Sequence, residues 1–368
     1  MSVYWNRRAR GLSPYVPGEQ PRDRKLIKLN TNEHPYPPSP KVAEAITAVL
    51  AEGAERLRRY PDPACTELRE AVARRYGVGP EQVFAGNGSD EILAFVFGAF
   101  FEGAPEPSAA SAKPDAEPVL FPDITYSFYP VYAKLWDIPF CAVPLAEDFY
   151  LHAEDYCVPS CGVILPNPNA PTGRALAVRE LLPLLSYQLE NRRIVVIDEA
   201  YAAFGAESLI PCVNEYPNLL TVHTLSKSAS LAGLRVGFAI GNENLIEGLC
   251  RIRDSFNSYT VDRLAQAGAA AALSDTAYYD GVNRQVAATR DRVSAALTGM
   301  GFIVIPSAAN FIFVRSPDMA GADFFARLRE RGILVRHFNK PRIADFLRIS
   351  IGTGGEMDAL LEECKELI

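Results

Sequence analysis

The chain of 368 residues is long enough to form two domains with substantial cores. Its hydrophobic fraction of 48% and charged fraction of 22% are typical of a globular protein and exclude a disordered one. A net charge of −7 argues against a nucleic-acid or anionic-membrane partner, and no apolar stretch is long enough to span a membrane. The seven cysteines are scattered without a CxxC pair, so we expect reduced thiols, no metal site and a cytoplasmic location.

The N-terminal third is predicted to contain three helices and a strand. Ser39 is placed to cap a helix that begins at Pro40, because proline fits the first helical position. Apolar residues at helical spacing predict a second helix from about Thr66, and 83–85 forms a short strand before a strongly apolar helix. Residues 104–118, rich in Ala, Pro and Ser, are predicted to form a surface insertion.

Short, continuous apolar runs characterise the middle third: 119–121, 162–165, 194–197 and 219–222. Such runs are typical of parallel strands buried on both faces, and helical patterns around 177–190 and 243–255 alternate with them. This part is therefore predicted to be a doubly wound α/β domain. The last third combines long helical patterns with strand-like runs, which predicts a smaller α+β domain.

An acid ends one of these runs. Asp198 follows Ile194–Ile197, so its carboxylate is expected at the C-terminal edge of the sheet, where α/β proteins build binding sites. An ionised carboxylate there can keep a pyridine nitrogen protonated, and Tyr201 can donate to a ring oxygen. A helix cap is the alternative role for Asp198.

A lysine follows the next strand-like run. Lys227 lies between Ser226 and Ser228, and Arg235 comes eight positions after it. A lysine in this setting suits reaction with an aldehyde, whereas Ser226 and Arg235 suit a phosphate. An amine, an acid and phosphate donors are the three kinds of group that pyridoxal phosphate requires.

The segment Gly86–Glu91 connects a predicted strand to a helix. Its glycines allow close approach of the backbone, and Ser89 and the backbone of Asp90 lie at the helix N-terminus, which attracts phosphate. The same residues are typical of an ordinary helix start, because Asp90 and Glu91 complement the helix dipole.

Two arginines interrupt strand-like patterns near the C-terminus. Arg348 lies within 346–351, where a charge needs an anionic partner, either a substrate or a structural acid. Arg336 lies in a similar setting. Tyr126, further towards the N-terminus, offers a ring that can stack on a flat cofactor.

Taken in order, these motifs resemble the fold-type-I pyridoxal-phosphate-dependent aminotransferases, and most closely the histidinol-phosphate aminotransferase family. The similarity covers nearly the whole chain and is carried by Leu12–Glu19, Lys28–Glu33, Arg59–Asp62, Gly86–Glu91, Asn169–Gly173, Asp198–Tyr201, Ser226–Lys227 and Leu347–Ile349. The resemblance implies a homodimer that transfers the amino group of L-histidinol phosphate to 2-oxoglutarate. It also implies an arm (1–29) that packs with the small domain, a large cofactor-binding domain (30–262) and a small domain (263–368).

The resemblance also implies roles for individual residues. Lys227 would hold the cofactor aldehyde and move a proton, Asp198 would pair with the ring nitrogen, and Tyr201 would contact the ring oxygen. Tyr126 would stack on the ring. The groups implied to hold the cofactor phosphate are Ser89, Asp90 through its backbone, Ser226, Arg235 and, from the neighbouring subunit, Tyr60. The groups implied to bind the acidic parts of the substrates are Arg348, Arg336 and Tyr15.

The chain departs from the family pattern at Ala170, where the family often has an asparagine that contacts the ring oxygen. Either Asn169 or Tyr201 would then make this contact. The cofactor motifs do not determine which bond at Cα breaks, so a lyase resembling threonine-phosphate decarboxylase and an aromatic or broad-range aminotransferase remain alternatives. A non-enzymatic binding protein is disfavoured by the intact Lys227 and Asp198. A nucleotide-binding protein would rest on the Gly86 loop alone.

Overall fold

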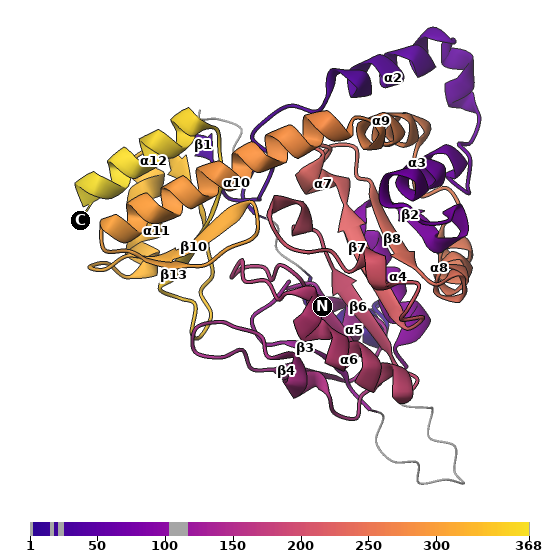
Figure 1. Ribbon diagram of the computed structural model, residues 1–368, viewed down its shortest axis with the longest axis horizontal. Helices are drawn as coiled ribbons and strands as arrows, with labels where there is room; N and C mark the ends of the chain where they lie inside the picture. Colours follow the sequence, from indigo (N-terminus) through magenta and orange to yellow (C-terminus); the bar gives the residue numbers. More distant parts are fainter. Residues whose placement is uncertain (1–2, 15–17, 21–25, 103–116, 368) are drawn as a thin grey trace.

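A seven-stranded sheet forms the centre of the larger part of the molecule in the computed structural model (Figure 1), which describes residues 3–14, 18–20, 26–102 and 117–367. The strand order is β2-β8-β7-β6-β5-β3-β4. The bounds are β2 (Val83–Gly86), β3 (Val119–Pro122), β4 (Phe140–Val143), β5 (Gly162–Pro166), β6 (Ile194–Asp198), β7 (Leu219–Thr224) and β8 (Gly237–Gly241). Only β8 runs antiparallel to its neighbours, so the predicted, mostly parallel sheet is confirmed.

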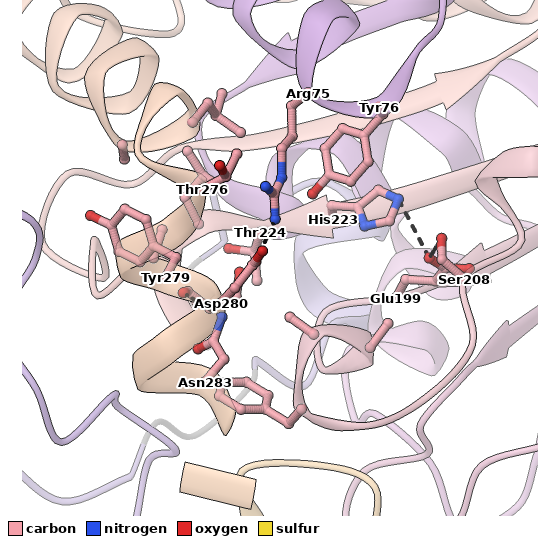
Figure 2. Close-up of a pocket in the computed structure, with 18 of the residues that line it drawn as sticks. Arg75, Tyr76, Glu199, Ser208, His223, Thr224, Thr276, Tyr279, Asp280 and Asn283 are labelled. Carbon is pink, nitrogen blue, oxygen red and sulfur yellow. Dashed lines mark hydrogen bonds and ion pairs between the residues drawn. The ribbon is translucent and has the colours of Figure 1, made fainter. Parts of the chain in front are cut away.

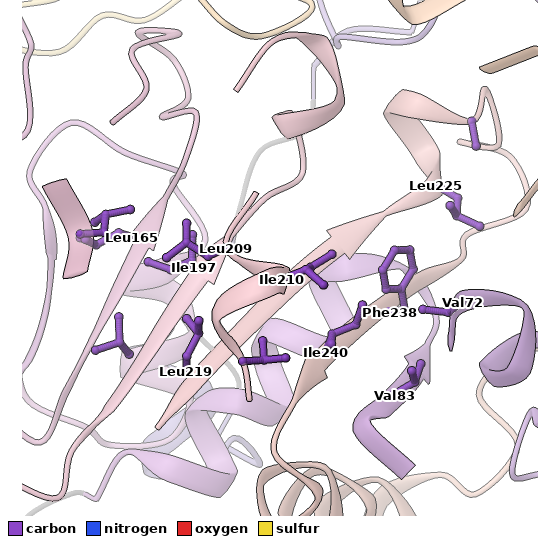
Figure 3. Packing of buried hydrophobic residues seen from close by; sticks show 14 of the residues in the cluster. Val72, Val83, Leu165, Ile197, Leu209, Ile210, Leu219, Leu225, Phe238 and Ile240 are labelled. Carbon is purple, nitrogen blue, oxygen red and sulfur yellow. The ribbon is translucent and has the colours of Figure 1, made fainter. Parts of the chain in front are cut away.

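Alternate side chains of each central strand enter separate hydrophobic clusters on the two faces of this sheet. In β6, Val195 and Ile197 belong to one cluster, whereas Ile194 and Val196 belong to the other. Figure 3 shows part of the first cluster, in which Ile197 and Leu219 from the sheet lie near Leu209 and Ile210. Burial on both faces explains why these strands are continuous apolar runs in the sequence.

Helices cover both faces of the sheet. Those that contribute to the first cluster are α3 (Thr66–Tyr76) and α6 (Val178–Glu190). Those that contribute to the second are α4 (Gly88–Phe100), α5 (Tyr129–Leu135) and α8 (Glu243–Phe256). The short α7 (Leu225–Ser228) follows β7 directly, and a further short helix, α1 (Arg7–Gly11), lies near the N-terminus.

The smaller part is built on a four-stranded antiparallel sheet in the order β12-β13-β10-β9. Its strands are β9 (Ile303–Ile305), β10 (Phe311–Arg315), β12 (Arg336–His337) and β13 (Phe346–Ser350). The helices α11 (Gly321–Glu330) and α12 (Gly354–Leu367) share a core with this sheet. Near the N-terminus, β1 (Ile27–Lys28) pairs in parallel with β11 (Ile333–Leu334), which attaches the start of the chain to this part.

Two helices connect the parts. The first, α9 (Arg263–Ser274), packs against α2 (Pro40–Ala51) and α3, and the second, α10 (Thr276–Gly299), continues to the smaller part, where it lies beside α12 (Figure 1). The packing of α9 on the larger part favours a boundary within α10, later than the predicted one at 262/263. The division into domains therefore stays a prediction.

Most predicted elements are present. Ser39 caps α2 by accepting from Lys41 N, with Pro40 in the first turn, as predicted. The sequence did not predict α1, α5, α7, α12, β1, β4 or β8. Most of the predicted insertion, residues 103–116, lies outside the described residues. Within the described part of the chain, no helix is long and apolar enough to cross a membrane.

Candidate active site

The predicted residues Asp198 and Lys227 lie on neighbouring strand ends of the large sheet. Asp198 ends β6, and Lys227 lies in α7, directly after β7. Both line a pocket of about 150 Å³. The other predicted residues around this pocket are Ser89, Asp90, Tyr126, Tyr201, Ser226, Arg235 and Arg348. The fold therefore gathers nine predicted residues from six separate segments into one site.

Lys227 presents its amine inside this pocket. Its Nζ donates to the carbonyl oxygen of Thr31 at 2.8 Å. Burial, with a smaller contribution from the nearby Arg348 guanidinium, lowers the pKa of Lys227 to about 8, whereas Glu33 acts in the opposite direction. An amine with this pKa has a substantial neutral fraction near neutral pH, which is the form that reacts with an aldehyde.

Asp198 is 5% exposed at the end of β6. Tyr129 donates its hydroxyl to Asp198 Oδ2 at 3.0 Å, and Ala200 N donates to Oδ1 at 3.2 Å. Burial raises the pKa of Asp198 to about 6 despite these two hydrogen bonds, which act to lower it. A cationic partner in the pocket would favour the charged form of this carboxylate.

Tyr201 lies beside Asp198 in the same pocket. Asn32 donates its side-chain amide to the Tyr201 hydroxyl at 3.0 Å, and the Tyr201 ring packs edge-on against Phe311. The hydroxyl is thus held by a group from the N-terminal part of the chain. This fixes its direction relative to the pocket.

An anion-binding cradle lies at the N-terminus of α4. Arg235 donates to Ser226 Oγ at 3.2 Å and to Asp90 Oδ2 at 3.1 Å, and Tyr126 donates to Asp90 Oδ1 at 2.5 Å. A Cβ added to Gly88 would lie 2.6 Å from the Arg235 guanidinium, and Gly88 has a φ of +77°. The backbone conformation favours glycine here, and its missing side chain leaves room for the Arg235 guanidinium.

The two carboxylates at this helix start are both engaged. Asp90 pairs with Arg235, and Glu91 accepts from the backbone N–H of Asn87 at 2.7 Å. The N-cap residue, Asn87, makes no side-chain hydrogen bond to the first turn of the helix. Ser89 lines the pocket instead.

Arg348 connects this pocket to a second one of about 240 Å³, the entrance pocket. Arg348 donates to the carbonyl oxygen of Asn30 at 3.0 Å, and its guanidinium lies 5.5 Å from the ring centre of Phe338. Arg336 pairs with Arg348 in register across β12 and β13, and its guanidinium also lies 5.5 Å from the ring centre of Phe338. The Phe338 ring thus contacts the guanidinium groups of both Arg336 and Arg348 in the entrance pocket.

The entrance pocket is attached to the large sheet by Arg342. Its guanidinium donates to Asp123 Oδ2 at 3.0 Å and to the carbonyl oxygens of Leu145 at 2.8 Å and Ala146 at 2.7 Å. Lys340 lines the same pocket. The segment between β12 and β13 is thereby held over the strand end of β3.

Two predicted residues, Asn169 and Tyr60, lie elsewhere. Asn169 is buried outside the pocket lining, and its amide donates to the Ile124 carbonyl oxygen and to Thr172 Oγ1, while Ala170 lines the pocket. Tyr60 is 76% exposed and stacks on Tyr259. Tyr15 lies outside the described residues. The placement of Asn169 behind Ala170 favours Tyr201 as the contact for a ring oxygen.

No function was predicted for Tyr129, Thr31 or Asn32, although all three contact candidate catalytic residues. Thr31 and Asn32 belong to the segment Lys28–Glu33 that carries the family resemblance, but the contacts of all three residues form only in the tertiary fold. Among the described residues, no cluster of three or more His, Cys, Asp or Glu side chains is arranged to hold a metal ion.

The comparisons with known proteins agree with this geometry. The family model for aminotransferase class I and II matches residues 24–363. The chain belongs to this family. It is 53% identical to histidinol-phosphate aminotransferase 1 of Bordetella parapertussis and 50% identical to histidinol-phosphate aminotransferase of Clostridium acetobutylicum, in both cases over 100% of this chain and at least 99% of the relative.

Solved structures confirm the predicted fold. A histidinol-phosphate aminotransferase from Sinorhizobium meliloti, solved in complex with pyridoxal-5′-phosphate, superposes with a TM-score of 0.83 at 24% identity over 100% of this chain and 99% of that one. A Thermus thermophilus aspartate aminotransferase superposes with a TM-score of 0.81 at 21% identity, with complete coverage of both chains. The chain is thus a pyridoxal-phosphate-dependent aminotransferase of fold type I.

The residues of the pocket fit this cofactor. An amine with a lowered pKa, a buried carboxylate and an arginine–serine pair at a helix N-terminus match its aldehyde, its ring nitrogen and its phosphate. A Cβ added to Gly237 would lie 2.6 Å from Ser89 N, so glycine leaves this backbone accessible beside the cradle.

Proposed function

We propose that this aminotransferase transfers the amino group of L-histidinol phosphate to 2-oxoglutarate, giving imidazole acetol phosphate and L-glutamate in histidine biosynthesis. The observation that carries the proposal is identity of 50–53% over the full length with relatives named histidinol-phosphate aminotransferase. The two arginines at one opening support it, because the amino donor carries a phosphate and the acceptor carries two carboxylates.

In this proposal the pocket residues hold the cofactor. The phosphate would be bound by Ser89, the backbone of Asp90, Ser226 and Arg235. Tyr126 would stack on the ring and Tyr201 would donate to the ring oxygen. When bound, pyridoxal phosphate supplies an electron sink for the bonding electrons of the substrate Cα.

Three residues would then act on protons and charge. With the cofactor in place, the Lys227 amine would accept the proton from the substrate Cα and would be positioned to pass it on to the cofactor. Asp198 would be ionised beside a protonated ring nitrogen and would favour the cationic form of that nitrogen. Tyr129 keeps the Asp198 carboxylate oriented through its hydrogen bond at 3.0 Å.

The substrates would be recognised by the arginines of the opening. Arg348 binds the acidic group of the amino donor and the α-carboxylate of glutamate in turn. Arg336 and Tyr15 contribute to binding the substrate phosphate. A guanidinium accepts either anion, because its planar donors match both carboxylate and phosphate.

The proposal also includes a homodimer in the cytoplasm. Tyr60 is exposed in the single chain, as expected for a side chain that reaches the cofactor phosphate of the neighbouring subunit. Light scattering would give the mass in solution. Mixed dimers of Tyr60→Phe and Lys227→Ala chains would regain one intact site if sites are shared, whereas independent sites would show no such recovery.

The decisive experiment is an absorbance titration of the holoenzyme. Histidinol phosphate should bleach the cofactor band, and subsequent 2-oxoglutarate should restore it. A band that responds to another amine but ignores histidinol phosphate would refute the substrate and retain the chemistry. Release of carbon dioxide without a requirement for a keto acid would instead identify a lyase.

A further inference from the structure

Three consecutive residues that follow β1, 30–32, each contact a different side chain of the catalytic pocket. The backbone carbonyl oxygens of the first two accept from Arg348 at 3.0 Å and from Lys227 Nζ at 2.8 Å. The third, Asn32, uses its side chain and donates from Nδ2 to the Tyr201 hydroxyl at 3.0 Å. Of these three contacts, the one from Asn32 can be changed by substitution of a side chain.

The other face of α7 borders a cavity of about 410 Å³, which α10 also lines. Figure 2 shows polar groups of this cavity paired with one another: Arg75 donates to Asp280, and Ser208 donates to Glu199. Each of these groups has its partner within that cavity, whereas residues 30–32 reach the catalytic pocket.

Asn32 is held firmly by the smaller part of the molecule. Its residue is 1% exposed, and its φ of +57° is one that asparagine adopts more readily than most residues. The Asn32 backbone N–H donates to Oγ of Ser350, the last residue of β13, at 2.8 Å. Its carbonyl oxygen accepts from the side-chain amide of Asn310, directly before β10, at 2.9 Å. The Asn32 side chain therefore starts from a fixed backbone position.

The Ser350 hydroxyl determines which end of the Asn32 amide faces Tyr201. Because the Ser350 oxygen accepts the Asn32 backbone N–H, its hydrogen is available for Asn32 Oδ1, which lies 3.0 Å away. The reverse orientation of the amide would leave that hydrogen without this acceptor. Asn32 Nδ2 therefore faces Tyr201 as a donor.

The Tyr201 hydroxyl must then use its own hydrogen elsewhere. A phenol has one hydrogen, and it does not point at a group that is itself donating to the phenol oxygen. Burial raises the pKa of Tyr201, although Arg348 and the Asn32 hydrogen bond act to lower it, so the phenol keeps its proton near neutral pH. Because Tyr201 lines the catalytic pocket, this hydrogen is available to an acceptor there.

From this chain of contacts we infer that Asn32 is a positioning residue, which turns the Tyr201 hydroxyl toward the catalytic pocket as a hydrogen-bond donor. Ser350 keeps the Asn32 amide in the orientation that this requires. Ser350 lies two residues after Arg348 in β13, so the strand that carries the candidate substrate-binding arginine also sets the direction of the Tyr201 donor. The inference rests on the proposed contact between Tyr201 and the ring oxygen of the cofactor.

A pH titration of the absorbance of the enzyme loaded with pyridoxal phosphate tests this direction. A donor to the ring oxygen stabilises its anionic form and so lowers the pH at which the bound cofactor releases its proton. Asn32→Asp keeps the size of the side chain but replaces the donor by an acceptor, to which Tyr201 would donate instead. We expect the titration midpoint to rise by about one pH unit. The charged residues that line the pocket are the same in all variants compared: Asp90, Asp198, Lys227, Arg235 and Arg348.

A double variant separates the direction of the hydrogen bond from the added charge. Tyr201→Phe alone should raise the midpoint, because it removes the same donor. If Asn32 acts through the Tyr201 hydroxyl, the double variant Asn32→Asp/Tyr201→Phe should have the midpoint of Tyr201→Phe. A further rise in the double variant, as large as that of Asn32→Asp alone, would show that the new carboxylate acts only by its charge and would overturn the inference.

Ser350→Ala tests the amide orientation without adding a charge, and it carries the test if Asn32→Asp does not fold. Loss of the hydroxyl allows the Asn32 amide to turn, so the midpoint should rise, by less than in Asn32→Asp. The matched control is Ser316→Ala. Ser316 lies buried directly after β10, its Oγ has no hydrogen-bond partner among the described residues, and its loss should leave the midpoint unchanged. Melting temperatures of the cofactor-free variants show which of them are folded. An unchanged midpoint in folded Ser350→Ala would overturn the role of Ser350.

Failure of this inference is distinct from failure of the proposed function. An unchanged midpoint in Asn32→Asp together with a raised midpoint in Tyr201→Phe would refute the role of Asn32 and retain that of Tyr201. An unchanged midpoint in Tyr201→Phe would refute the proposed contact with the ring oxygen and, with it, the inference. No substrate is present in the titration, so its outcome does not depend on the identity of the amino donor.

Discussion

The catalytic pocket and the entrance pocket differ in how they are held. The catalytic pocket is formed by buried strand ends of one sheet, and burial itself shifts the pKa values of Asp198 and Lys227. The entrance pocket is formed where a segment of the smaller part meets the larger part, and exposed Arg342 holds it through hydrogen bonds. The comparison indicates that the chemistry is built into the sheet, whereas substrate recognition depends on how the two parts meet.

The largest effect is expected at the centre of the catalytic pocket. Lys227→Ala should lower the single-turnover rate by about 10⁴-fold, because it removes the group that transfers the proton. Lys365→Ala, which removes an exposed lysine in the last turn of α12, should leave the rate unchanged. A Lys227→Ala variant that retains full turnover would show that this pocket is not the active site.

The second prediction concerns the stability of the cofactor-free protein. Unfolded Asp198 releases its proton near pH 3.8, but the folded protein retains it until about pH 6. The unfolded state therefore ionises first, and the free energy of unfolding should fall by about 2 kcal/mol between pH 4 and 6 on account of this group. Stability from the raised pKa is thus fully present at low pH and lost as the pH rises.

Urea denaturation across this pH range measures the effect. Glu199, whose pKa burial raises from 4.5 to about 7, adds a decline of the same sign. The comparison is therefore between the unsubstituted protein and Asp198→Asn, which should lose the Asp198 contribution alone. Equal slopes for the two proteins would show that burial does not raise this pKa.

The third prediction tests the junction between the two pockets. Arg348→Gln should raise KM for 2-oxoglutarate by about 100-fold, since a buried charge-assisted contact to a carboxylate is lost. Cofactor affinity should remain nearly constant. Arg315→Gln, on the neighbouring strand β10 and exposed, is the control and should leave KM unchanged. A loss of cofactor affinity instead of substrate affinity would place Arg348 in the cofactor site.

The smallest effect is expected at the entrance pocket. Arg342→Gln should raise KM for both substrates by about tenfold and change kcat by less than about twofold, because the pair is partly exposed and acts on Arg336 and Arg348 through the segment. Asp123→Asn should also raise KM. The double variant should raise KM by less than the two single-variant effects combined, because both substitutions break the same contact. If the two KM effects were independent, the Arg342–Asp123 pair would not be what holds the entrance pocket in place.

Sequence patterns were sufficient to predict elements that are buried on both faces or that begin with a local capping motif. The run Ile194–Ile197 predicted a buried parallel strand because both of its faces are covered, and Ser39-Pro40 predicted a helix start because capping is local. By contrast, β8 was missed, since five residues with two terminal glycines carry little periodicity and the strand exists through its antiparallel pairing with β2 and β7.

The site shows the same division. The order of Asp198, Lys227 and Arg235 predicted the cofactor groups, because each stands at a strand end or in a short motif. The contact of Tyr129 with Asp198 spans 69 positions of the chain, and no local pattern announces it. Asn169 was a candidate for the ring oxygen, but the turn after β5 places Ala170 at the pocket instead.

By itself, the sequence determined the α/β class, the positions of the main strands, the family resemblance and the cofactor, since these depend on local spacing and on residue types with distinctive chemistry. Only the tertiary structure decided which side chains meet: the orientation of Asp198 by Tyr129, the attachment of the entrance by Arg342, and the cavity behind Lys227. The physical reason is that burial, hydrogen bonding and empty space are properties of groups brought together from distant segments, and short-range periodicity does not record them.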